Sequence, residues 1–299
     1  MLCAVVLLLS FSACKGDNPT VNISNARRVV ATGTTEDGMK YSIYSDNTAE
    51  ITRYTGKEPV VTVPAMIDGK PVIAIGNNAF DFTSITDVTL PDSIQVIRKW
   101  AFSNCLKLTA INLPEGLTTI EEYAFYRCRS MPAFDLPDSI KTGGEYAFAH
   151  CNALTTFELP ATMTVIPNGL FSQCAGLTSV TWQTDITAIG EYSFASCKAL
   201  TSFTIPETVT SIGQWCFAEC ISMTNVYIPK SITSIPYYAF GGCKVLTEIH
   251  FGGTEAEWFA IKFDSRTFFQ SCPHTVVFDA VPGESVTVPE TEAPVTEAP

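Results

Sequence analysis

The chain has 299 residues, of which 46% are hydrophobic and only 16% are charged, so it can bury a substantial core. Its formal net charge of -12 argues against partners such as nucleic acid or acidic lipid, which need clustered Lys and Arg. We therefore expect one elongated domain and no nucleic-acid partner.

The first residues are typical of an export signal. An apolar run from Leu2 to Leu9 is too short to span a bilayer and is followed by Phe11-Ser12-Ala13-Cys14. This pattern resembles a bacterial lipobox, although Phe11 stands where Leu is usual and no Lys or Arg precedes the run. The resemblance implies a lipoprotein-type signal peptide over residues 1–13 and lipidation of Cys14. Two acyl chains on that residue would be enough to hold the protein at a membrane surface. A plain secretory signal is the alternative.

A polar stretch and a short β-type segment come next. Residues 14–31 have no sustained period, which predicts a flexible tether. Tyr41–Tyr44 and Ala49–Tyr54 flank Ser45-Asp46-Asn47-Thr48, which has the composition of a hairpin turn. We expect this hairpin, within residues 32–57, to cover the apolar end of the array that follows.

A pattern that begins with Ala-Phe and ends on Cys recurs along the chain. Its Phe residues are separated by one step of 22 residues and then six of 23: Phe80, Phe102, Phe125, Phe148, Phe171, Phe194, Phe217 and Phe240. Periods of 20 to 29 residues are typical of leucine-rich repeats, in which each repeat buries its apolar face against the next. The chain is therefore predicted to be an α/β solenoid.

Each repeat also contains a strand-like segment. In Leu108-Thr109-Ala110-Ile111-Asn112-Leu113-Pro114, positions 1, 4 and 6 are apolar. The corresponding segments begin at Ile85, Leu108, Met131, Leu154, Leu177, Leu200, Met223 and Leu246. They predict eight strands about 4.8 Å apart in one parallel sheet on the concave face, with short helical or turn segments opposite.

Together these segments follow the pattern Ile-Gly-x-x-Ala-Phe-x-x-Cys-x-x-Leu-Thr-x-Ile-x-Leu-Pro. Residues 58 to 278 therefore resemble the BspA-like leucine-rich repeats of bacterial surface proteins. Single repeats depart from the pattern at Thr83, Gly143, Leu170, Gln183 and Ser193. The resemblance implies a surface-exposed recognition or adhesion module, and it implies no particular ligand.

Seven cysteines recur at one phase of the repeat: Cys105, Cys128, Cys151, Cys174, Cys197, Cys220 and Cys243. They predict an inward-facing column of free structural thiols, because parallel side chains on neighbouring repeats lack disulfide geometry. Thr83 is the equivalent residue in the first regular repeat. Cys216 lies close to Cys220 but belongs to the column otherwise filled by Ala, and no second pair at ligand spacing accompanies these two, so we predict no zinc site and no cofactor.

Two exposed surfaces are candidates for binding. Position 2 of the strands is a threonine column that we interpret as structural. Position 5 varies, and its candidate ligand-binding residues are Asn112, Asp135, Glu158, Tyr227 and His250. A second candidate is the aromatic wall, two residues before each Phe and interrupted by Gly169: Trp100, Tyr123, Tyr146, Tyr192, Trp215 and Tyr238. For this wall, packing between repeats is the favoured interpretation and ligand stacking the alternative.

The period stops at Phe251, and a different segment closes the array. Thr254 and Glu257 have the spacing of a capping box, which predicts a short helix whose Trp258 and Ile261 cover the core. Residues 252–278 are the predicted C-terminal cap, including a last strand at 275–278. Residues 279–299, rich in Pro, Thr and Glu, predict a disordered tail.

These features favour a non-catalytic module exported to the cell surface, anchored only by its lipid, that binds an unknown protein or glycan. A passive spacer without a ligand site is the alternative. No catalytic motif occurs, and the histidines lie in different parts of the chain. Asp135 and Glu158 leave a hydrolase as a remote alternative, although an open sheet offers no enclosed pocket to separate their pKa values.

Overall fold

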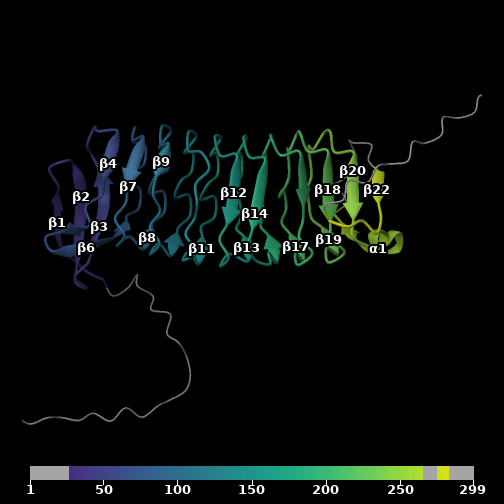
Figure 1. Ribbon diagram of the computed structural model, residues 1–299, viewed down its shortest axis with the longest axis horizontal. Coiled ribbons are helices and arrows are strands. Elements are labelled where there is room, and N and C mark those ends of the chain that lie inside the picture. Colours follow the sequence, from purple (N-terminus) through teal and green to yellow (C-terminus); the bar gives the residue numbers. More distant parts are fainter. Residues whose placement is uncertain (1–26, 265–274, 283–299) are drawn as a thin grey trace, which may run out of the picture.

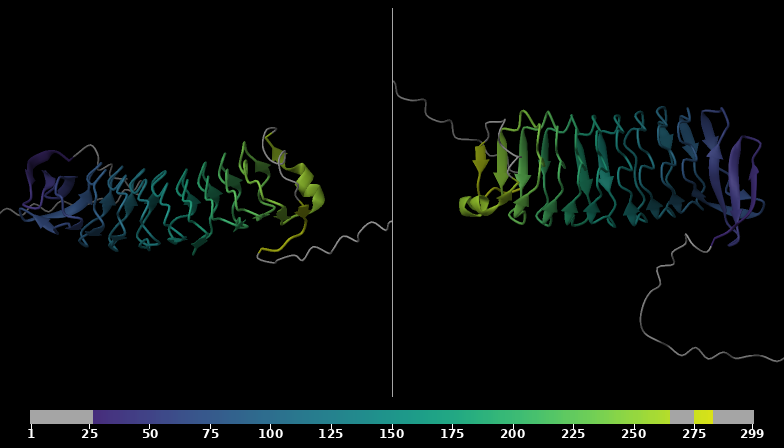
Figure 2. Two further views of the ribbon diagram at one scale, coloured as in Figure 1. Left: turned by 90° about the horizontal axis from the view of Figure 1, so that it is seen from above. Right: turned by 180° about the vertical axis from the view of Figure 1, so that it is seen from behind.

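The structure, a computed structural model, describes residues 27–264 and 275–282. The predicted solenoid is confirmed, since successive repeats stack along one axis in a gently curved row (Figures 1 and 2). Nearly all regular elements are strands (Figure 1), and parallel pairing joins the repeats. The predicted signal peptide, Cys14 and most of the tether and tail lie outside the described residues.

The N-terminal end is closed by an antiparallel unit of three strands: β1 (Val29–Thr34), β2 (Met39–Tyr44) and β3 (Ala49–Tyr54). β2 and β3 are the predicted hairpin, and β1 begins inside the segment predicted as tether. β3 also pairs in parallel with β6 (Lys70–Ile75), so the cap continues directly into the array. β5 (Met66–Ile67) folds back on β6 through a turn at Asp68 and Gly69, whose φ angles are 49° and 71°.

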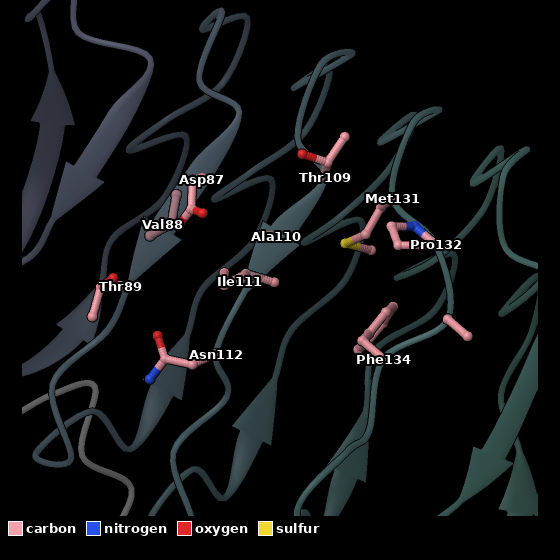
Figure 3. A pocket seen from close by; sticks show the side chains of 11 residues that line it. Asp87, Val88, Thr89, Thr109, Ala110, Ile111, Asn112, Met131, Pro132 and Phe134 are labelled. Atoms are coloured by element: carbon pink, nitrogen blue, oxygen red, sulfur yellow. The ribbon is translucent and has the colours of Figure 1, made fainter.

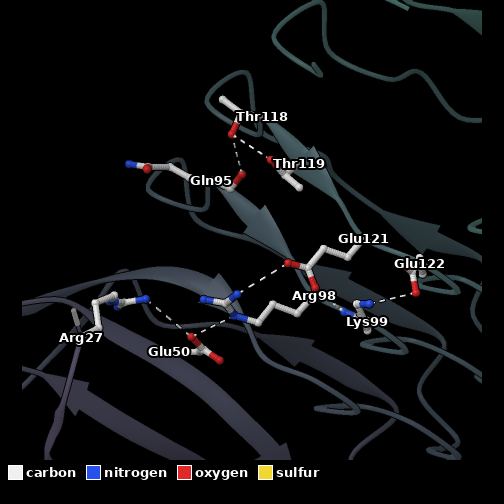
Figure 4. A network of polar contacts seen from close by, with 9 residues as sticks. All are labelled: Arg27, Glu50, Gln95, Arg98, Lys99, Thr118, Thr119, Glu121 and Glu122. Carbon is white, nitrogen blue, oxygen red and sulfur yellow. Dashed lines mark hydrogen bonds and ion pairs between the residues drawn. The ribbon is translucent and has the colours of Figure 1, made fainter. Parts of the chain in front are cut away.

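A buried charge network fixes this cap to the first repeats. Glu50 of β3 is only 5% exposed, and its Oε2 lies 3.1 Å from Arg98 Nε. Arg27 approaches the same carboxylate at 3.8 Å, while Arg98 also reaches Glu121 at 3.6 Å. Figure 4 shows Glu50 between the two guanidinium groups, with the cap on one side and the repeats on the other.

The predicted strand segments form one side of the solenoid, here called the long-strand face. Its strands are β4 (Val60–Thr62), β7 (Asp87–Thr89), β9 (Ala110–Ile111), β12 (Thr156–Leu159), β14 (Ser179–Trp182), β16 (Ser202–Thr204), β18 (Asn225–Ile228), β20 (Glu248–Phe251) and β22 (Thr275–Val277). Position 2 threonines support the ladder, because their hydroxyls donate to carbonyls one repeat back. Thr109 Oγ1 lies 3.0 Å from Thr86 O, and Thr178 Oγ1 lies 2.9 Å from Thr155 O.

The prediction of eight strands in one sheet is wrong. The face consists of three separate parallel sheets, β4-β7-β9, β12-β14 and β16-β18-β20-β22, and residues 131–137 form no strand. Pro132 replaces the position 2 threonine there, so it has no N–H to donate to the preceding repeat. The second interruption, between β14 and β16, coincides with Trp182, a large half-buried side chain at a position where Leu159 and Ile205 are fully buried.

A second side, the short-strand face, consists mainly of two-residue strands. After β6 these are β8 (Val96–Ile97), β10 (Thr119–Ile120), β11 (Thr142–Gly143), β13 (Val165–Ile166), β15 (Ala188–Ile189), β17 (Ser211–Ile212), β19 (Ser234–Ile235) and β21 (Lys262–Phe263). The residue after most of these strands donates its N–H to the preceding repeat, as from Gly144 to Ile120 O at 2.8 Å and from Gly190 to Ile166 O at 2.8 Å. Pro167 and Pro236 occupy this position at the two places where pairing stops, β11 to β13 and β17 to β19.

The Ala-Phe segments form the third side and are turns. Alternate residues have left-handed backbones, at φ values near 60°, two positions before and two positions after each Phe. This alternation directs N–H groups toward the next repeat: Phe102 N donates to Ala124 O at 2.8 Å, and Phe125 N donates to Ala147 O at 2.9 Å. These N–H groups donate to the following repeat, whereas those of Gly144 and Thr109 on the two strand faces donate to the preceding repeat. The repeats are therefore connected by hydrogen bonds on three sides.

The core is filled by columns of identical residues. The Phe rings of successive repeats stack, with centroids 5.0 Å apart for Phe80 and Phe102 and 5.2 Å apart for Phe194 and Phe217. At the C-terminal end, α1 (Glu255–Ala260) has the predicted capping box at Thr254 and Glu257. Trp258 is buried against Phe251, so the helix covers the apolar end of the array as expected.

Candidate functional site

The cysteine column lies inside the protein, as predicted, and every member within the described residues is a free buried thiol. Each Sγ donates to the Phe carbonyl of the preceding repeat, for example Cys128 to Phe102 O at 3.1 Å and Cys174 to Phe148 O at 3.1 Å. Burial raises the pKa of Cys174 to about 12, so its thiol stays protonated. Thr83 Oγ1 instead donates to Phe80 O of its own repeat at 2.7 Å, and it lies 3.4 Å from Cys105 Sγ of the next repeat. The column therefore connects repeats and offers no reactive thiolate.

The position 5 column is not one continuous exposed surface. Tyr227 and His250, predicted as ligand-binding residues, are buried at 5% and 8% exposure. The Tyr227 hydroxyl binds the Glu207 carboxylate, and His250 Nε2 lies 3.2 Å from Glu248 Oε2. The C-terminal end of the column is thus occupied by internal contacts, and these two residues are poor candidates for a ligand.

Asn112 is exposed, but its side chain makes structural bonds. Its Oδ1 accepts from Leu90 N at 2.6 Å, and its Nδ2 donates to Leu90 O at 2.8 Å. The amide thus reproduces a ladder pair between two repeats. This leaves Asp135 and Glu158 as the freely presented members of the predicted set.

Asp135 and Glu158 lie in one acidic cavity of about 240 Å³. Its other lining residues are Glu115, Leu136, Pro137, Asp138, Pro160 and Gln183. Glu158 Oε1 accepts from Gln183 Nε2 at 2.6 Å, and no Lys or Arg lines the cavity. The structure thus brings together two of the predicted residues with two further carboxylates.

A second cavity, of about 410 Å³, opens beside the acidic one, where the long-strand ladder stops. Its floor is apolar and contains Val88, Ile111, Met131 and Phe134, while Asp87, Thr109 and Asn112 are among the polar residues around it (Figure 3). Ile111 and Phe134 are half-buried, whereas their equivalents Val88 and Phe157 are buried. The interruption at Pro132 therefore opens the core to the surface.

The aromatic wall is half-buried, and its rings stack on one another. Trp100 and Tyr123 have centroids 4.1 Å apart and planes 4° apart, and Tyr123 stacks on Tyr146 at 5.2 Å. Tyr146 also fills the space beside Gly169, where a Cβ would lie 2.2 Å from its ring. Because the ring faces are covered by neighbouring rings, mainly the edges are presented to solvent. Packing between repeats accounts for this arrangement.

Metal sites and membrane-spanning helices do not occur in the part of the chain that the structure describes. Among residues 27–264 and 275–282, no group of three His, Cys, Asp or Glu side chains could hold a metal ion. Over the same ranges, no helix has the length and apolar character of a membrane span. His150 and His250 lie in different repeats, and His274 is outside the described residues.

The apolar cavity of about 410 Å³, here called the apolar groove, was not predicted from the sequence. Its signal was present, because Pro132 is the one residue other than threonine in the position 2 column. The effect of Pro132 on strand pairing depends on the loss of one N–H, which a pattern of apolar positions does not record.

Comparison with known proteins concerns the repeat array as a whole. A family model described as "BspA type Leucine rich repeat region" matches residues 73–186 and 164–278. A leucine-rich repeat protein from Bacteroides ovatus has a similar structure, with a TM-score of 0.61 at 24% identity over 79% of this chain and 66% of that one. A leucine rich cell surface protein from Faecalibacterium prausnitzii has a TM-score of 0.45 at 22% identity, over 79% of this chain and 98% of that one. No curated protein matches.

Proposed function

Because the chain belongs to the BspA-type leucine-rich repeat family, we propose that it is a non-catalytic recognition module at the cell surface, which binds a protein or glycan through the long-strand face. The export signal and the predicted lipidation of Cys14 support this location. Lipid attachment at Cys14 is the only membrane contact proposed, and a secreted form is the alternative.

One observation carries the proposal, namely the interruption of the long-strand face at Pro132. A passive spacer needs only regular stacking, and a threonine at this position would supply it, as in the other repeats. Here an apolar groove of about 410 Å³ adjoins an acidic cavity of about 240 Å³. Exposed apolar surface costs solubility, and it is typical of interaction sites.

The remote alternative, hydrolysis by Asp135 and Glu158, has weaker support. Glu158 is hydrogen-bonded to Gln183, and the cavity is lined mostly by exposed polar residues. General acid catalysis requires a carboxyl group whose pKa is raised by an enclosed apolar site. Binding therefore accounts for this geometry better than catalysis.

The test is a binding survey with the full chain, folded and purified, against extracellular-matrix proteins and an array of surface glycans. Binding that is weakened by substitutions in the long-strand face would support the proposal. Uniform absence of binding by folded protein would favour the spacer. Metabolic labelling with an alkyne fatty acid, compared between the wild type and Cys14→Ala, tests the anchor separately.

A further inference from the structure

We propose that the interruption at Pro132 is a docking groove for an extended peptide of a partner protein, which carries an apolar residue next to Lys or Arg. The peptide would lie in an extended conformation over residues 132–136, fill the apolar cavity with one side chain and place its cation in the acidic cavity. This inference rests on the proposed recognition function and names the site and the class of ligand.

The first support is the backbone of residues 132–136. Within the described residues, none of these five makes a backbone hydrogen bond to either neighbouring repeat or to any other segment. By contrast, the strands on both sides pair with their outer neighbours, β9 with β7 and β12 with β14. Unpaired N–H and C=O groups can hydrogen-bond the backbone of a bound peptide.

The second support is the apolar floor. Ile111 of β9 and Phe134 of the unpaired segment are both half-buried and line the same cavity (Figure 3). They line the cavity of about 410 Å³ together with Met131 and Val88. Side chains alternate across a strand, so a peptide in this position would direct every second side chain toward the floor. An aliphatic residue matches the size and character of this cavity.

The third support is the charge beside the groove. Asp135 follows Phe134 directly and lies in the cavity with Glu115, Asp138 and Glu158, and the residues that line this cavity include no cation. Carboxylates gathered without a cation favour a positively charged ligand, and Lys or Arg next to the aliphatic residue would supply that charge.

These observations favour a peptide over other occupants. A glycan has no repeating N–H and C=O groups to pair with residues 132–136. A second copy of this chain carries a net charge of -12, which opposes approach to an acidic site. The partner is therefore expected to have a neutral or basic extended segment.

The experiment uses the full chain and two fluorescein-labelled heptapeptides, measured by fluorescence polarisation. One peptide alternates Thr and Val and ends in two Lys, and the other ends in two Glu. We expect the Lys peptide to bind at least tenfold more tightly at low salt, and the difference to shrink as ionic strength rises. Equal affinities for the two peptides would contradict the assignment.

Two sets of variants locate the site. Pro132→Thr restores the N–H at position 2, so it should close the groove, slow hydrogen exchange at residues 133–136 and reduce Lys peptide binding at least tenfold. Asp135→Asn combined with Glu158→Gln changes only exposed side chains and should remove the preference for Lys over Glu. Glu191→Gln, an exposed carboxylate outside both cavities, is the matched control and should change neither value.

Unchanged Lys peptide binding in Pro132→Thr, with exchange slowed at residues 133–136, would overturn the groove as the site. Dimerisation in sedimentation experiments that Pro132→Thr abolishes would assign the groove to a second copy and also overturn the proposal. Matrix-protein or glycan binding that survives Pro132→Thr would leave the recognition function standing and reject only this site. The two failures are therefore distinguishable.

Discussion

Each buried thiol of the column donates to the Phe carbonyl of the repeat before it, as Cys105 does to Phe80 O at 3.1 Å, whereas the Thr83 hydroxyl donates to Phe80 O within its own repeat. Cys174 illustrates the role, because it is fully buried and donates to Phe148 O at 3.1 Å. The Cys174→Ala variant loses this bond and leaves a small cavity. We expect a loss of about 1 to 3 kcal/mol in the free energy of unfolding, measured by denaturant titration. Stability equal to that of the wild type would contradict a structural role.

The same thiols predict a dependence of stability on pH. Burial raises the pKa of Cys174 from 9.0 to about 12, so between these values the unfolded chain loses a proton that the folded chain keeps. The unfolded state then binds fewer protons, and stability falls as pH rises through this range. Each such thiol contributes a loss of about 1.4 kcal/mol per pH unit. Titrations at pH 8 and pH 10 should show a smaller decrease for Cys174→Ala than for wild type, and an equal decrease would reject the assignment.

Asn112 shows how a predicted ligand-binding residue can have a different task. Its amide both accepts from Leu90 N and donates to Leu90 O. Asn112→Ala removes both bonds, and we expect the free energy of unfolding to fall by about 1 to 3 kcal/mol. Thr89→Ala, at the preceding exposed position of the same column, is the control and should change stability by less than about 0.5 kcal/mol. Similar values for the two variants would mean that the bonds of Asn112 contribute little.

At the scale of elements, the N-terminal cap is attached to the array by Glu50. This carboxylate is buried between Arg27 and Arg98, so removing its charge takes away one of the carboxylates that face each guanidinium group, while Asp46 remains beside Arg27 and Glu121 beside Arg98. Glu50→Gln should lower the free energy of unfolding by about 1 to 3 kcal/mol, with the largest increase in hydrogen exchange in β1 to β3. The control is Glu122→Gln at the exposed pair with Lys99, where the expected cost is below about 1 kcal/mol. If both variants cost the same, the buried network does not hold the cap.

The elements show what the sequence could predict. A period of 23 residues and the apolar positions within it were enough for the repeat, the Phe and Cys columns and the helix capped by Thr254, because each depends on local chemistry repeated many times. The third ladder was not predicted, since left-handed backbones at Trp100 and Tyr123 run against the usual preference of bulky residues. Pairing between repeats holds those residues in place. The burial of Tyr227 was not predicted, because Glu207, which binds its hydroxyl, lies in the preceding repeat.

At the scale of the whole molecule, two of the three hydrogen-bonded sides are interrupted together at one junction. Between the repeats of Phe125 and Phe148, the long strands are unpaired beside Pro132 and the short strands β11 and β13 are unpaired at Pro167. The Ala-Phe ladder still crosses this junction, through Phe125 N to Ala147 O at 2.9 Å. At the interruption between β14 and β16, by contrast, β15 and β17 remain paired.

In a solenoid, each repeat is stabilised mainly by its neighbours, so the interface with the fewest bonds limits how far unfolding spreads as one unit. We therefore expect the array to unfold in two parts, residues 27–145 and residues 150–264. Hydrogen exchange followed by mass spectrometry at increasing denaturant should separate the two ranges into groups with different opening free energies. The variant Pro167→Glu restores, across this junction, the backbone N–H that Glu121 donates two repeats earlier, and it should merge the groups. A single group in the wild-type protein would show that the Ala-Phe ladder and the Phe and Cys columns are enough to couple the two parts.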